Sequence, residues 1–160
     1  MLGASKLWID QQNKEDKKQV SGSNKNEVLK TIMPMKMAAY ERCILFLERV
    51  SPHNLLGRVS PGGKTTLQYY GELSEIIRSE FDFNMSQQIY VSNQSWAKLV
   101  IAKEELLNML NVAVAGAPHN AEAIGFANNL VEQLQAQETI ITQSAIFALK
   151  DEAAEYFKID

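Results

Sequence analysis

The 160-residue chain has few of the features that secreted, membrane-spanning and nucleic-acid-binding proteins carry. Its single cysteine, Cys43, cannot form an internal disulfide and therefore suits a reducing compartment. No run of about 18 apolar residues exists, so no complete transmembrane helix is expected. Acidic and amide side chains follow Leu7, Trp8 and Ile9 too soon for a signal peptide. The formal net charge of −3 lacks the basic surplus of a typical nucleic-acid-binding domain.

The sequence also lacks the spacings from which metal and catalytic sites are built. His53 and His119 each follow a proline, and neither belongs to a His-x-x-x-His or Glu-x-x-His pattern of the kind that binds metals on helices. We interpret both as exposed or capping residues. The Glu-x-x-His pairs of di-iron bundles are absent. Cys43 lies on the apolar side of a helix and is interpreted as a small buried hydrophobe. No catalytic residue, metal ligand or cofactor is predicted.

A glycine-rich string at residues 57–65 invites comparison with a phosphate-binding loop. That loop needs four residues between its two glycines, but five separate Gly57 from Gly63. The position that the motif requires as glycine is Arg58. A phosphate-binding loop also follows a buried strand, whereas this string follows a helix and a Ser-Pro stop. The sequence therefore predicts a turn at Pro61-Gly62-Gly63 and no nucleotide cofactor.

What the sequence does contain is apolar residues at helical spacing, from Met35 onward. Thr65 and Gln68 have the spacing of a capping box, and Ser92 is predicted to cap the next helix. Short connections favour antiparallel neighbours, so we expect an all-α antiparallel bundle of about five helices. The helices are expected at residues 36–50, 65–84, 92–115, 120–135 and 139–157, with a short turn at 54–59.

The first 33 residues differ from the rest. Between Asp10 and Lys30 the chain is rich in Gln, Asn, Lys, Glu, Asp and Ser, which bury too little to offset the entropy of ordering. The residue before a proline avoids helical geometry, so Pro34 marks the predicted boundary. We expect a disordered, mobile polar arm at residues 1–33 and a bundle domain at residues 34–160.

Charged residues on the first two helices form the one candidate cluster. Two Glu-Arg dipeptides lie seven residues apart on the first helix, and the second helix adds an arginine and a glutamate. Arginine suits either a structural ion pair between helices or the capture of an acidic group on a partner. Both interpretations stay open. The cluster comprises Glu41, Arg42, Glu48, Arg49, Arg78 and Glu80.

Several strings resemble an uncharacterised family of Bacteroidetes proteins, over about residues 35–157. That family has no assigned activity, cofactor or catalytic residue, so the resemblance implies no site. Its members often begin with a membrane-spanning helix, which is absent here. The resemblance therefore leaves two interpretations: residues 1–33 are a juxtamembrane segment on the cytoplasmic side of the inner membrane, or this member of the family is soluble in the cytoplasm. The strings are Ala39-Tyr40-Glu41-Arg42, Leu45-Phe46-Leu47-Glu48-Arg49, Ser51-Pro52, Ile77-Arg78-Ser79-Glu80-Phe81, Ser86-Gln87-Gln88-Ile89-Tyr90-Val91-Ser92, Trp96 and Ala102-Lys103-Glu104-Glu105.

Helices without a reserved site favour a non-enzymatic protein-interaction or scaffold module, with a protein partner or a second copy of the chain. The alternative is a small-ligand-binding or enzymatic helical domain that uses a cleft formed by Glu41, Arg42 and Arg78. Nucleic-acid binding is a third hypothesis, which the sequence disfavours because acidic residues dilute the basic ones and no aromatics are interleaved. It would depend on Lys14, Lys17, Lys18, Lys25 and Lys30.

Overall fold

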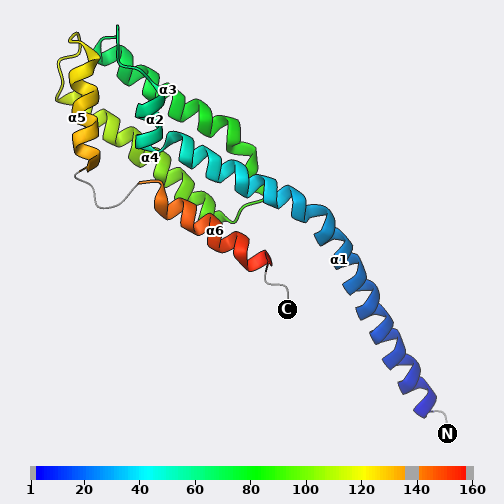
Figure 1. Cartoon of the computed structure of the whole chain (residues 1–160). Coiled ribbons are helices and arrows are strands. Elements are labelled where there is room, and N and C mark those ends of the chain that lie inside the picture. Colours follow the sequence, from blue (N-terminus) through cyan, green and yellow to red (C-terminus); the bar gives the residue numbers. More distant parts are fainter. Residues whose placement is uncertain (1–2, 136–140, 158–160) are drawn as a thin grey trace. The chain divides into compact units, whose positions relative to one another are not determined.

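The computed structural model describes the backbone of residues 3–135 and 141–157, and side chains at residues 27–135 and 141–156. The described part is helical and contains no named strand, which confirms the predicted all-α class (Figure 1). An isolated antiparallel bridge joins Thr65 to Glu122. The helices are α1 (Gly3–Val50), α2 (Pro52–Arg58), α3 (Thr66–Asn84), the 3-10 helix η1 (Met85–Ile89), α4 (Asn93–Ala115), α5 (Ala123–Gln135) and α6 (Gln143–Phe157).

Local capping signals set the starts of α3 and α4 within one residue of their predicted positions. Thr65 accepts a hydrogen bond from the Gln68 backbone N–H, and the Gln68 side chain accepts one from the Thr65 N–H. The Ser92 hydroxyl accepts from the backbone N–H of Ser95. The predicted turn at 54–59 is instead a short helix, α2, with a proline in its first turn. Proline fits there because the first N–H groups of a helix have no intrahelical acceptor.

The prediction that a helix starts after Pro34 is wrong, because α1 passes through this residue. Pro34 has no N–H, so the carbonyl of Lys30 loses its α-helical donor, while the bonds on either side continue the helix. Residues 3–33 are thus helical, and the expectation of irregular chain there is corrected. Whether they move as a separate arm stays a prediction. The chain divides into the units Met1–Met37 and Ala38–Asp160, close to the predicted boundary.

In the second unit, α4 packs against α3, α5 and α6, and α2 packs against α5. Because α3 and α4 contact each other and are joined only by η1 and residues 90–92, they run antiparallel (Figure 1). Aromatic rings link the elements: Phe46 of α1 contacts Phe81 edge-on at 5.8 Å between ring centroids, and Phe81 lies 5.5 Å from Trp96. These contacts form a core like that of a helical bundle.

Helix rotation was predicted less accurately than helix position. Leu67, Ile124, Val131 and Tyr156 lie at the apolar helical spacing from which we would expect core positions, yet all four are exposed. In α5 the core is formed by Ala123, Phe126, Ala127 and Leu130 instead. Each helix carries more apolar residues than one face holds, so periodicity alone left the buried side ambiguous. No helix in the described part of the chain combines the length and the apolar character that crossing a bilayer requires.

Candidate functional site

The structure joins part of the predicted Glu/Arg cluster between α1 and α3. The Arg49 Nε donates to Glu80 Oε1 at 2.7 Å, and the same guanidinium lies 2.5 Å from that oxygen through its terminal nitrogen. The hydrogen bond and the charge of Glu80 raise the pKa of Arg49. Arg58 of α2 donates to the Arg49 carbonyl at 2.9 Å. Arg49 and Glu80 therefore connect α1 to α3.

Arg42 has a different environment. Its guanidinium carbon lies 5.2 Å from the centre of the Phe83 ring, and no described carboxylate forms an ion pair with it. Phe83 is 72% exposed and Leu45 is 58% exposed. Arg42, Leu45, Arg49, Glu80 and Phe83 line a shallow hollow of about 240 Å³ between α1 and α3. We call these five residues the Arg42–Phe83 surface.

The remaining members of the cluster lie elsewhere. Glu41 and Glu48 are exposed, and neither they nor Arg78 line the hollow beside Arg42. Glu104 of α4 pairs with Lys103, whose hydrogen bond and charge lower the pKa of Glu104, and the charge of Arg78 adds a smaller effect in the same direction. Arg42 is thus the only one of Glu41, Arg42 and Arg78 that lines this hollow.

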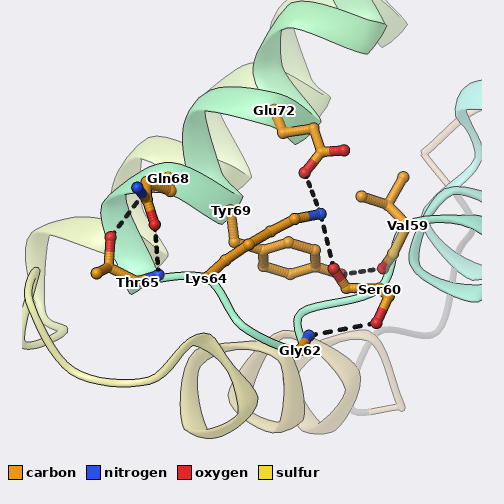
Figure 2. A network of polar contacts seen from close by, with 8 residues as sticks. All are labelled: Val59, Ser60, Gly62, Lys64, Thr65, Gln68, Tyr69 and Glu72. Atoms are coloured by element: carbon orange, nitrogen blue, oxygen red, sulfur yellow. Dashed lines mark hydrogen bonds and ion pairs between the residues drawn. The ribbon is translucent and has the colours of Figure 1, made fainter.

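The glycine-rich string forms a closed turn between α2 and α3, as Figure 2 shows. Gly63 adopts a φ of 71°, which favours glycine. The Lys64 ammonium donates to the Ser60 carbonyl at 2.8 Å, pairs with Glu72 and lies 5.8 Å from the Tyr69 ring centre. A phosphate-binding lysine would point toward a ligand, but this lysine holds the turn against α3. The predicted turn is confirmed.

The buried Tyr69 completes this corner of the second unit. Its hydroxyl donates to the Val59 carbonyl at 2.9 Å (Figure 2). Its ring meets that of Phe126 edge-on, with 6.4 Å between the ring centroids. Burial, with a smaller contribution from Glu72, raises the pKa of Tyr69. Tyr69 of α3 thus has a structural role: its hydroxyl holds the chain just after α2, and its ring packs against α5.

We expect Thr65→Ala to lower the free energy of unfolding by about 1 kcal/mol, because it removes the cap of α3 and leaves the Gln68 N–H without its acceptor. Urea denaturation of both proteins would measure the difference. Thr65→Ser, which keeps the hydroxyl, is the matched control and should retain most of the stability. Equal losses in the two variants would show that the cap bond contributes nothing.

A second polar network involves Glu152 of α6, which the sequence analysis did not single out. Its carboxylate accepts from the Tyr40 hydroxyl at 2.9 Å, from the Ser92 backbone N–H at 2.8 Å and from the Ser92 hydroxyl at 2.6 Å. Burial raises the pKa of Glu152, but hydrogen bonds from Ser92, Ser95 and Tyr40 outweigh it and lower the pKa overall. Glu152 thereby connects α6 to α1 and to the start of α4.

The thiol and the histidines behave as predicted. Cys43 is fully buried, and desolvation raises its pKa to about 11, so its thiol stays protonated at neutral pH. His53 and His119 are exposed. Within the described residues, no group of three or more His, Cys, Asp or Glu side chains could hold a metal ion.

The chain was compared with protein families, curated proteins and solved structures. A family model described as "Family of unknown function (DUF7935)" matches residues 1–156. The chain belongs to this family. No curated protein and no solved structure matches the chain. The DUF7935 match begins at residue 1, so it also covers the N-terminal part of α1, which the sequence resemblance left out.

Proposed function

We propose that this DUF7935 protein is a non-enzymatic protein-interaction module that binds its partner through the Arg42–Phe83 surface. The observation that carries the proposal is an arginine that stacks on a largely exposed aromatic ring and has no described carboxylate partner. Arginine and aromatic side chains are enriched among the residues that dominate binding energy at protein interfaces.

The chemistry of the surface defines the partner that it would fit. The exposed rings and methyl groups of Phe83 and Leu45 would gain by burial, and the Arg42 guanidinium would pair with a carboxylate. The Arg49–Glu80 pair, already formed, holds the edges of the hollow in place. We therefore propose a partner segment with an acidic residue beside apolar ones, on another protein or on a second copy of this chain.

Less supports the alternative, a small-ligand-binding or enzymatic domain that uses Glu41, Arg42 and Arg78. Of these three residues only Arg42 lines the hollow between α1 and α3. Convergent charged groups in one pocket are what such a site would require.

The proposal places the module in the cytoplasm, since the single cysteine suits a reducing compartment. The resemblance to Bacteroidetes proteins extends it to a tether at the inner membrane, through a segment outside this chain. Fractionation of cells that produce the native protein would test both parts. Recovery from the periplasm would contradict them.

Photo-crosslinking tests the surface directly. We expect Phe83→p-benzoylphenylalanine to give one discrete crosslinked product in cells of the native host, because the ring would be buried against the partner. The matched control carries the same photoreactive group at Phe147, which is similarly exposed but lies on α6. Mass spectrometry of the product distinguishes another protein from a second copy.

In the variant that carries p-benzoylphenylalanine at position 83, the additional change Arg42→Glu should reduce the yield of the crosslinked product about tenfold or more. The new carboxylate would repel the acidic residue of the partner with which Arg42 is proposed to pair. The same substitution should leave the melting temperature nearly unchanged, since Arg42 is exposed. Equal crosslinking from positions 83 and 147, or no effect of Arg42→Glu, would contradict the proposal.

A further inference from the structure

A cavity of about 720 Å³ lies within the second unit, away from the Arg42–Phe83 surface. Its lining comes from the end of α1, from α2, from the C-terminal turn of α5 and from the start of α6. Small-molecule sites usually occupy about 300–1,000 Å³, so the cavity has the size of a ligand pocket. Its walls are mainly apolar, formed by Pro52, Leu56, Val131, Leu134, Ile141 and Ile146.

One buried side-chain hydroxyl in the described lining has no hydrogen-bond partner. Thr142, directly before α6, is 0% exposed, and its hydroxyl has no hydrogen bond to any group that the structure describes. A buried hydroxyl without a partner is unfavourable, so a partner supplied from the cavity would be favoured. Ser74 of α3 has the only other such hydroxyl among the described side chains, and it does not line this cavity.

The charges around the cavity restrict the ligand. Glu48 is the only carboxylate among the described residues of its lining, which include neither lysine nor arginine. His53 also lines the cavity, and its side chain is exposed to solvent. Among these described residues, an anionic ligand would meet a like charge and no lysine or arginine, whereas an uncharged ligand would not be repelled.

From these features we infer that the cavity binds an uncharged apolar molecule with one hydrogen-bonding group, such as a medium-chain alcohol, whose polar end pairs with the Thr142 hydroxyl. The apolar walls from α2, α5 and α6 bury the hydrocarbon part. This binding is independent of the interaction surface between α1 and α3, so either proposal can fail without the other.

Calorimetric titration with 1-decanol tests the inference on the full chain. We expect saturable binding with a stoichiometry of one, and binding about fivefold weaker in Thr142→Val, because this nearly isosteric change removes one hydrogen bond. Ser74→Ala is the matched control: it removes the other unpartnered buried hydroxyl and should leave decanol binding unchanged. Equal affinity of wild type and Thr142→Val, or no saturable binding, would overturn the inference.

Two further measurements separate the cavity from nonspecific apolar adsorption. Val131→Trp should abolish decanol binding by filling the cavity, while Ile124→Trp, on the same helix but outside the lining, should not. Both positions are about half exposed, so both variants should fold, as melting curves would verify. Decanoate should bind at least tenfold more weakly than decanol. Loss of binding in both tryptophan variants, or tighter binding of decanoate, would contradict the assignment.

Discussion

Phe46→Ala is expected to lower the free energy of unfolding by about 3–5 kcal/mol, a large share of the roughly 5–15 kcal/mol that a domain of this size has. Phe46 is 1% exposed and its ring contacts Phe81, which in turn contacts Trp96 of α4. Truncation removes the buried ring and leaves a void that the surrounding helices can fill only in part. Guanidinium denaturation followed by circular dichroism would measure the loss.

The matched control is Phe83→Ala, which removes the same atoms from a ring that is largely exposed on the neighbouring helix. We expect a change of less than about 0.5 kcal/mol there, because the ring is already in contact with water. A similar loss in both variants would mean that α1 is not packed against α3 as described. A loss of unfolding free energy below about 1 kcal/mol for Phe46→Ala would likewise mean that α1 does not pack against α3 in this way.

Glu152→Ala is expected to cost about 2 kcal/mol at neutral pH, the second largest effect. The change leaves the hydroxyl of Tyr40, a residue only 2% exposed, without its acceptor, and a buried unsatisfied donor costs about 1–3 kcal/mol. The two hydrogen bonds from Ser92 to Glu152 are exposed to solvent, so they contribute less to the stability than the bond from Tyr40. Tyr40→Phe, which removes the donor together with the hydroxyl, is the control and should cost less than Glu152→Ala.

The contribution of Glu152 should also depend on pH, with a definite sign. Its folded-state pKa lies below the ordinary value of 4.5. Between these two pKa values the unfolded chain binds more protons, so the stabilisation is complete above about pH 4.5 and is lost as the pH falls through the folded-state value. The difference in unfolding free energy between wild type and Glu152→Gln should shrink on acidification. A difference that is constant from pH 7 to about pH 3 would contradict this account.

The helix positions that the sequence predicted well are those set by neighbours in the chain. Thr65 and Ser92 cap α3 and α4 through bonds that reach only three residues ahead. The turn at Gly62 and Gly63 likewise depends on local backbone geometry. Such contacts are present in any conformation that forms the helix, so a short window of sequence contains the whole cause.

The sequence could not predict the contacts that join distant segments. Glu152 meets Ser92 across 60 positions, and nothing near it in the sequence distinguishes it from the glutamates that are exposed. Arg42 and Arg49 have the same local context, each following a glutamate, yet one lies over Phe83 and the other pairs with Glu80. The rotation of α1 against α3 decides which arginine reaches which residue.

By itself, the sequence determined an all-helical chain without an evident catalytic or metal site, and it located the caps of α3 and α4, because periodicity and capping act over a few residues. The tertiary structure alone decided which faces are buried, where Glu152 binds, and that α1, α2, α5 and α6 line a cavity beside Thr142. These features depend on how helices far apart in the chain pack and rotate against one another, and no local pattern of residues records that packing.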